Sequence, residues 1–272
     1  MDTNRTAEVA IIGGTGVGQF PLDTGPEEVT VPTPWGETTV QIGTLRGRRT
    51  AFLARHGAGH RLPPHRIPFR ANLAALKRLG VRAALATTAV GGLRADLRPG
   101  TLVLLDDFID FTKNGRGTTF FDTPGQVVHT DFTAPYSAEL RTGVQEAARN
   151  LNLSLRPGGT YLCADGPRYE TPAEVRLFAS WGADVVGMTG VPEATLAREA
   201  GIHYAGISLV TNPGAGLSPT PLTHAEVEEA MRAALPDLRS LLTETVAGLD
   251  AGTLPPVGPG VPLPGLEDAR YG

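Results

Sequence analysis

A cluster of cationic side chains stands out in the first quarter of the sequence, directly after an apolar segment. Residues 55–61 contain two arginines and two histidines, separated by two glycines and an alanine. Arginine can bind phosphate through two parallel hydrogen bonds, histidine adds a further donor, and glycine lets the backbone approach an anion. We therefore expect an anion site here, with a solvated turn as the alternative. A metal site is disfavoured because the segment holds no carboxylate and no third histidine.

Three more loops bring hydroxyl groups and open backbone amides to the ends of expected strands. The ends of strands form the ligand-binding side of α/β sheets, so these loops could surround one anion. The first loop is glycine-rich, but no helix follows it, which disfavours a dinucleotide-binding fold and leaves a tight turn without ligand as the alternative. The loops are residues 13–18 with Thr15, residues 87–92 with Thr88, and residues 188–190 with Thr189.

An amide and a carboxylate follow two other apolar segments. The expected strand over residues 204–210 stops abruptly at a Pro-Gly pair and leaves Asn212 at its carboxyl end. The expected strand over residues 159–163 leads to Tyr169 and Glu170. An aromatic ring can stack on a ligand ring, while a neighbouring carboxylate and an amide can accept and donate hydrogen bonds. These three side chains are therefore candidates for recognising a heterocyclic base.

Strands and helices alternate along the chain and must position these groups. We expect a single α/β domain over residues 1–250, with a mixed central sheet flanked by helices, and a Pro/Gly-rich tail over residues 251–272 that is loose or draped over the surface. Residues 106–136 are expected to form a long irregular segment, functional or at a subunit contact. Expected strands span residues 9–12, 28–31, 38–45, 49–54, 81–87, 101–105, 159–163, 184–188 and 204–210, and expected helices span residues 68–79, 137–151, 171–181, 192–200 and 223–248.

Composition excludes several classes of protein. The 272 residues carry a formal net charge of −4 without a block of like charge, which disfavours a nucleic-acid or membrane surface. The single cysteine, Cys163, excludes a disulfide framework and a cysteine metal cluster. No apolar run approaches the ~20 residues of a membrane span, and residues 1–8 lack an apolar signal core. We expect a cytoplasmic protein.

The order and spacing of the loops resemble the nucleoside phosphorylase family, which includes purine nucleoside phosphorylase and 5′-methylthioadenosine phosphorylase. The resemblance implies reversible transfer of a pentose from a purine to phosphate, with inversion at the anomeric carbon. It also implies a homotrimer that needs no metal or organic cofactor, with phosphate as co-substrate. The resemblance covers roughly residues 9–248 and rests on residues 12–16 (IGGTG), 54–57 (ARHG), 71–77 (ANLAALK), 87–91 (TTAVG), 166–171 (GPRYET), 181–189 (WGADVVGMT), 191–193 (VPE) and 209–212 (LVTN).

The resemblance also implies roles for individual residues. Met188 would line the sugar, Tyr169 would pack on the base, and His129 would approach the sugar 5′ pocket of a neighbouring subunit. Breaking the glycosidic bond needs phosphate under the anomeric carbon and a donor that stabilises charge on the leaving purine. The expected catalytic residues are Asn212, Glu170 and His56. The expected phosphate ligands are Thr15, Arg55, His56, Thr88, Ala89 and Thr189.

The residues expected at the base favour one class of purine. Methylthioadenosine phosphorylases carry Asp at the position of Asn212, and adenine presents an amino donor that suits a carboxylate. A 6-oxopurine presents an oxygen acceptor and an N1–H donor, which suit the Asn212 amide and the Glu170 carboxylate. The resemblance therefore implies a 6-oxopurine nucleoside phosphorylase that cleaves inosine or guanosine to the free base and ribose 1-phosphate in purine salvage.

The sugar 5′ substituent is less constrained. His224 matches the histidine that purine nucleoside phosphorylases use for the 5′ hydroxyl, although a helix-surface histidine is the alternative. S-methyl-5′-thioinosine and S-methyl-5′-thioadenosine therefore stay as alternative substrates. An NAD-binding oxidoreductase and a nucleotide-binding protein without catalysis are less favoured, because the first glycine loop lacks its helix and the phosphate-loop residues are all present.

Overall fold

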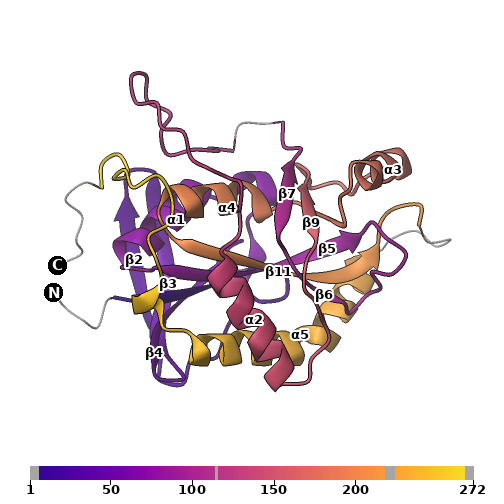
Figure 1. The fold of residues 1–272 in the computed structure, drawn as a ribbon, viewed down its shortest axis with the longest axis horizontal. Helices are drawn as coiled ribbons and strands as arrows, with labels where there is room; N and C mark the ends of the chain where they lie inside the picture. Colours follow the sequence, from indigo (N-terminus) through magenta and orange to yellow (C-terminus); the bar gives the residue numbers. More distant parts are fainter. Residues whose placement is uncertain (1–5, 114–115, 218–223, 267–272) are drawn as a thin grey trace.

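The computed structural model describes residues 6–113, 116–217 and 224–266, without the side chains of residues 224–226. A mixed central sheet is covered by helices on both faces, as expected (Figure 1). Two core clusters lie on the two faces of the sheet. One packs beneath α1 (Phe69–Arg78) and α4 (Gly190–Glu199), and the other beneath α2 (Ala138–Asn150) and α5 (His224–Gly248). The α/β fold class predicted from the sequence is confirmed.

The strands follow the order β2-β3-β4-β1-β5-β10-β9-β7, and β11 pairs with both β5 and β6. The directions are mixed, because β1 runs parallel to β4 and β5 whereas β10 runs antiparallel to β5. The long partners β5 and β11 run parallel through the centre. The strands are β1 (Val9–Gly13), β2 (Glu27–Thr33), β3 (Gly36–Leu45), β4 (Arg48–Ala54), β5 (Ala83–Gly92), β6 (Leu102–Leu104), β7 (Asp107–Asp110), β8 (Leu155–Arg156), β9 (Thr160–Cys163), β10 (Val185–Gly187) and β11 (His203–Pro213).

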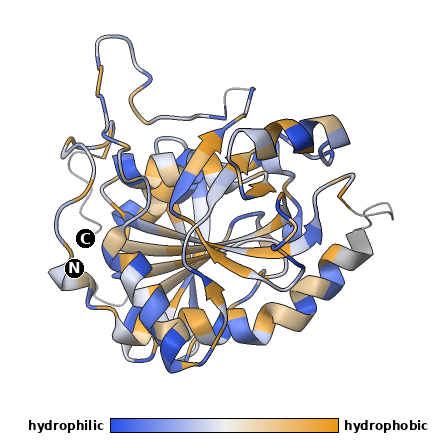
Figure 2. Cartoon of the chain, turned by 45° about the vertical axis from the view of Figure 1, so that its right-hand side comes forward, coloured by the Kyte–Doolittle hydropathy of each residue, from blue (hydrophilic) through white to orange (hydrophobic). Residues whose placement is uncertain are grey.

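The central strands consist largely of apolar residues, as the hydropathy colouring shows (Figure 2). Every residue of β1 is buried, and β11 is buried from His203 to Asn212. Burial on both faces requires continuous runs of small and β-branched residues, and β1 and β11 have them. The ends of these strands can therefore carry polar side chains to a site while the rest of each strand builds the core.

Local sequence signals set the helix boundaries. Ser137 accepts a hydrogen bond from the amide of Leu140 and begins α2. Thr171 and Glu174 form a capping box at the start of α3 (Pro172–Ser180). Among the described residues, no helix has both the length and the apolar character that crossing a membrane requires.

Two sequence-based boundaries are wrong. We expected a strand over residues 81–87 followed by a loop, but β5 continues to Gly92 because β11 and β10 pair with its second half. We also expected residues 106–136 to be irregular throughout, but β7 lies within them and pairs with β9. The local sequence predicts a loop in both places, whereas distant strand partners decide the structure.

The described part of the tail lies on the domain. Arg82 donates to the carbonyls of Gly252 and Leu254 at 2.9 and 2.7 Å, and His203 Nε2 lies 2.7 Å from the carbonyl of Pro255. Residues 251–266 therefore match the draped alternative. The division into residues 1–250 and 251–272 stays a prediction.

Candidate active site

A cavity of about 430 Å³ opens where β5, β10 and β11 end. This size is typical of a small-molecule site. Segments from seven parts of the chain meet on its wall, including the glycine loop, the cationic loop and the loop after β10. The structure thus brings together most of the side chains that the sequence singled out. The predicted residues on the wall are Thr15, His56, Thr88, Ala89, Tyr169, Glu170, Met188, Thr189 and Asn212.

A β-bulge aims the Asn212 side chain. Val210 lies opposite Val90, but Asn212 lies opposite Gly91, so Thr211 is an extra residue in β11. A bulge changes the direction in which the following side chains point. The Thr211 hydroxyl donates to Asn212 Oδ1 at 2.9 Å, and Asn212 Nδ2 donates to the carbonyl of Pro213 at 2.9 Å. This arrangement fixes the amide and leaves its second N–H for a ligand.

Tyr169 and Glu170 form another part of the wall. Tyr169 is 41% exposed, so one side of its ring is available for a planar ligand. Burial raises the pKa of the Glu170 carboxyl above its usual value of 4.5, and Glu174 also raises it. An ionised Glu170 can accept a hydrogen bond from a donor on the base, and it loses this capacity when it is protonated.

Hydroxyl groups and backbone amides line the part of the site predicted to hold phosphate. Thr88 is hydrogen-bonded to the buried Ser208 at 2.8 Å, which fixes its hydroxyl on the wall. The amide of Gly14 donates to the hydroxyl of Thr87 at 3.1 Å and holds the glycine loop close to β5. A Cβ at Gly14 would lie 2.5 Å from the carbonyl of Thr87, so only glycine allows this approach.

Arg55 is the largest fully buried side chain among the described residues, and it is not part of the cavity wall. Its Nε and Nη2 donate to Glu193 at 2.7 and 2.6 Å, and its Nη1 donates to the carbonyl of Thr87 at 2.6 Å. Tyr204 donates to the same Glu193 carboxylate at 2.7 Å. Burial alone lowers the pKa of the guanidinium, but the charge and hydrogen bonds of Glu193 outweigh it and raise the pKa. A phosphate contact from Arg55 therefore stays a prediction.

Tyr161 supports the loop that carries Thr189. Its hydroxyl oxygen accepts hydrogen bonds from the amides of Thr189 and Gly190, both at 3.1 Å. The ring is fully buried beneath the start of α4, and a Cβ at Gly190 would lie 2.8 Å from it. The position of the Thr189 hydroxyl on the wall thus depends on a tyrosine of β9.

His56 is neutral at pH 7. Its pKa is lowered from 6.5 to about 4, mainly by burial; the hydrogen bond to the carbonyl of Leu62 opposes this shift, and the charges of Arg55 and His60 add to it. Its Nδ1 lies 2.8 Å from the carbonyl of Leu62, so Nδ1 carries the proton and donates it. The other ring nitrogen then holds a lone pair. Since hydrogen phosphate carries one hydroxyl, His56 can accept its proton in a hydrogen bond.

We expect His56 to make the stability of the protein depend on pH. The unfolded chain binds a proton at this side chain near pH 6.5 and the folded protein only near pH 4, so the free energy of unfolding falls as the pH drops through this window. The variant His56→Gln cannot titrate and should show a shallower decline. Urea unfolding above, within and below the window measures the effect. The exposed His65 serves as control, because His65→Gln should keep the decline of the unchanged protein; an equally steep decline in His56→Gln would contradict the assignment.

The structure does not place either histidine predicted at the sugar 5′ group on the described cavity wall. His129 is exposed on the segment between β7 and α2, part of which projects from the body of the protein (Figure 1). The side chain of His224, at the start of α5, lies outside the described residues. Their predicted contacts with the sugar 5′ group stay predictions.

Sequence reasoning missed the groups that hold the site in place. Glu193 lies in an expected helix and in the family motif of residues 191–193, but nothing in the sequence indicates that it is fully buried and pairs with Arg55. Tyr161 and Ser208 lie within expected strands, over residues 159–163 and 204–210. A polar residue in an otherwise apolar strand was the available signal, since buried polar groups need partners.

The fold and the cavity define a class of protein. The family model described as "Phosphorylase superfamily" matches residues 8–247, and the chain belongs to this family. It is thus a nucleoside phosphorylase of the pentosyltransferase type.

Individual relatives narrow the class. The chain is 52% identical over 238 residues to the "Probable 6-oxopurine nucleoside phosphorylase" of Dictyoglomus turgidum, covering 88% of this chain and 90% of that one. It is 48% identical over 244 residues to the "6-oxopurine nucleoside phosphorylase" of Pyrococcus furiosus, covering 88% and 91%. A solved structure of methylthioadenosine phosphorylase from Schistosoma mansoni with adenine is similar with a TM-score of 0.82 and 34% identity, covering 89% and 91%.

Proposed function

We propose that the protein is a 6-oxopurine nucleoside phosphorylase, which cleaves inosine or guanosine with phosphate to the free base and ribose 1-phosphate. The observation that carries this proposal is the placement of Asn212 and Glu170 on the wall of one cavity with Thr88 and Thr189. The amide donates to the purine O6 or N7, the carboxylate accepts from N1–H, and the hydroxyl groups hold phosphate. The names of the relatives from Dictyoglomus turgidum and Pyrococcus furiosus support the same substrate class.

The reaction follows from what these groups stabilise. As the glycosidic bond breaks, negative charge develops on the purine, and the Asn212 amide donates a hydrogen bond to it. Phosphate held by the threonines attacks the anomeric carbon from the other side, and its hydroxyl donates to His56. Binding both reactants in one cavity supplies the proximity that the reaction needs.

Phosphate-dependent release of hypoxanthine from inosine tests this function. We expect turnover with inosine and guanosine, no turnover without phosphate, and unchanged activity after dialysis against a metal chelator. The last expectation follows from our proposal that the enzyme uses phosphate as co-substrate and neither a metal nor an organic cofactor. Brisk cleavage of methylthioadenosine without turnover of inosine or guanosine would refute the assignment.

A methylthio substrate is the second candidate, favoured by apolar side chains in the cavity. Met188 and Val227 both line it, and Val227 is 6% exposed on α5. The methylthioadenosine phosphorylase of Schistosoma mansoni has the same fold. The ratio of kcat/KM for inosine to that for S-methyl-5′-thioinosine separates the two candidates, and the ratio for S-methyl-5′-thioadenosine separates the base classes.

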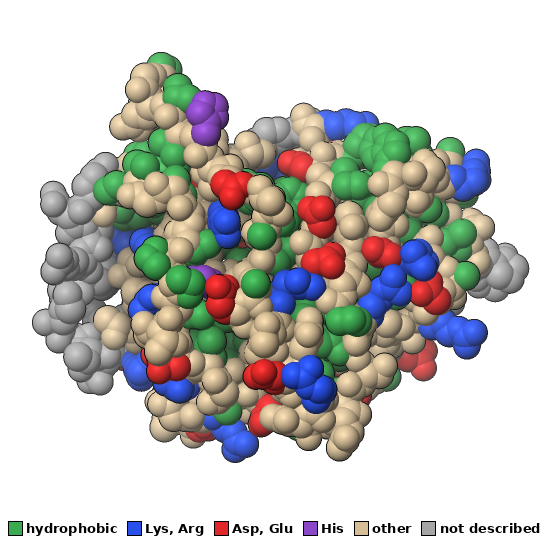
Figure 3. Space-filling view, viewed as in Figure 1, with side chains coloured by type: hydrophobic (Ala, Val, Ile, Leu, Met, Phe, Trp, Pro, Cys, Tyr) green, Lys and Arg blue, Asp and Glu red, His purple; other side chains and the backbone are tan. Residues whose placement is uncertain are grey.

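We also propose that the enzyme acts in purine salvage in the cytoplasm as a homotrimer. Hydrophobic side chains gather over α3 on the surface in Figure 3, and Leu177 and Trp181 are 42% and 47% exposed. Exposed apolar patches mark protein contacts. The projecting segment that carries His129 could reach a neighbouring subunit. A mass near three times 28.5 kDa in light scattering supports the trimer.

A further inference from the structure

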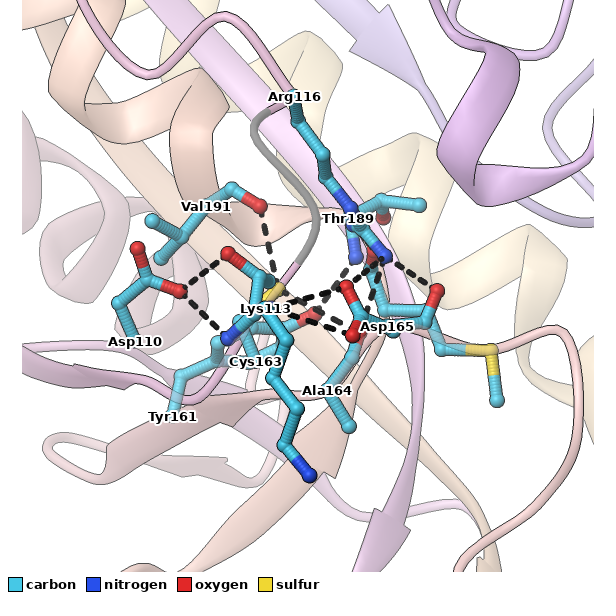
Figure 4. Close-up of polar contacts among 11 residues, drawn as sticks. Asp110, Lys113, Arg116, Tyr161, Cys163, Ala164, Asp165, Thr189 and Val191 are labelled. Atoms are coloured by element: carbon cyan, nitrogen blue, oxygen red, sulfur yellow. Dashed lines mark hydrogen bonds and ion pairs between the residues drawn. The ribbon is translucent and has the colours of Figure 1, made fainter.

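A buried arginine lies where two strands of the site separate. β9 and β10 run parallel, with Cys163 opposite Gly187 in the last pair. Beyond this pair β9 leads to the base-binding residues Tyr169 and Glu170, and β10 leads to Met188 and Thr189. Arg116, from the segment between β7 and α2, lies between the two segments that follow β9 and β10, and its side chain is 1% exposed (Figure 4).

The Arg116 guanidinium donates hydrogen bonds to backbone carbonyls in both segments, the one after β9 and the one after β10. Its Nη1 donates to the carbonyl of Met188 at 2.5 Å. Its Nη2 donates to the carbonyls of Asp165 and Ala164, the latter at 3.4 Å. The Asp165 carboxylate lies 3.5 Å from Nη2 and also accepts from the amide of Lys113 at 3.1 Å, so Lys113 and Arg116 both contact Asp165 (Figure 4).

These contacts complete the support of the loop after β10. Tyr161 holds the amides of Thr189 and Gly190, and Arg116 holds the carbonyl of Met188 just before them. Carbonyls beyond the last strand pair lose their partners in the sheet, and a buried carbonyl needs a replacement. The planar guanidinium presents several donors in a fixed geometry and can satisfy carbonyls of two segments at once.

We propose that Arg116 is a positioning residue that fixes the base-binding loop relative to the phosphate-binding loop. The inference rests on the proposed phosphorylase reaction, in which the base and phosphate must lie on opposite sides of the anomeric carbon. A misplacement of about 1 Å can cost about 10²-fold in rate. Arg116 touches neither reactant and acts through the backbone of Asp165 and Met188.

The test compares Arg116→Ala and Arg116→Lys with a matched control. In Arg116→Ala we expect kcat for inosine to fall on the order of 10²-fold, with a much smaller change in KM, because alignment matters most in the transition state. Arg116→Lys keeps the charge but lacks the planar guanidinium. It should recover less than half of the loss of kcat on a logarithmic scale. Arg82→Ala also removes a guanidinium from two backbone carbonyls, but at the tail, and should keep kcat while lowering the melting temperature.

The outcomes separate this inference from the proposed function. Absence of inosine turnover in the unchanged protein contradicts the function itself. With turnover present, the inference is overturned by a folded Arg116→Ala variant with unchanged kcat, by a loss confined to KM, or by an equal loss of kcat in Arg82→Ala. Full recovery of kcat in Arg116→Lys overturns the role that we assign to the planar guanidinium. Thermal unfolding shows which variants fold. If Arg116→Ala does not fold, the kcat of Arg116→Lys decides: a reduced kcat supports the inference and an unchanged kcat overturns it.

Discussion

Replacing Asn212 with aspartate is expected to shift the enzyme from inosine towards adenosine-type substrates. A carboxylate accepts hydrogen bonds only, so it pairs with the amino group of adenine and opposes the oxygen of a 6-oxopurine. A buried mismatch of this kind costs about 1–3 kcal/mol, which corresponds to about 5–150-fold in kcat/KM. The ratio of kcat/KM for inosine to that for methylthioadenosine measures the shift.

The structure shows what else this change does. The Thr211 hydroxyl can still donate to a carboxylate oxygen, but the carbonyl of Pro213 loses the N–H that it accepts from Asn212. We therefore expect a modest loss of stability beside the change in specificity. Asn212→Ala is the control, because it removes the donor without adding an acceptor and should weaken all purine substrates. An unchanged substrate ratio in Asn212→Asp would show that this side chain does not contact C6 of the base.

Removing the Glu193 carboxylate is expected to destabilise the protein more than any other single change in the site. The ion pair with Arg55 is fully buried, and both side chains are 0% exposed. Breaking a buried pair by removing one partner costs about 3–5 kcal/mol, because the remaining charge is uncompensated. Tyr204 also loses its acceptor. Urea unfolding of Glu193→Ala without phosphate measures the loss, and a loss below about 1 kcal/mol would contradict it.

A pair of charge changes separates stability from function. The double variant Glu193→Gln with Arg55→Met removes both charges and keeps an acceptor for Tyr204, so most of the stability should return. Its phosphorolysis should stay low if Arg55 contacts phosphate, as the family resemblance implies. Wild-type activity in the stable double variant would show that Arg55 serves the fold alone.

The sequence predicted the residues that line the cavity better than the residues that hold them in place. Asn212 could be placed at a strand end because Pro213 and Gly214 stop the apolar run. The partner of Arg55 could not be found, because Glu193 lies 138 residues away and pattern reasoning sees only neighbours. The role of Arg116 could not be predicted for the same reason. This residue lies in a segment without periodicity, and the carbonyls that it binds belong to the distant segments after β9 and β10.

Chain topology explains the errors in the fold prediction as well. The second half of β5 consists of small residues and two glycines that resemble a loop when read alone. Its pairing with β11 makes it a strand, and this pairing joins segments about half the chain apart. Local propensity is a weak guide wherever such tertiary partners decide.

The extra residue in β11 lets a strand residue present its side chain to the cavity. Up to Val210, side chains alternate between the two cores, and any change there alters the packing. After Thr211 the register shifts by one residue, so Asn212 still pairs with Gly91 while its side chain lines the cavity. A point mutation at position 212 therefore changes the group that faces the ligand, while the core residues up to Val210 stay the same.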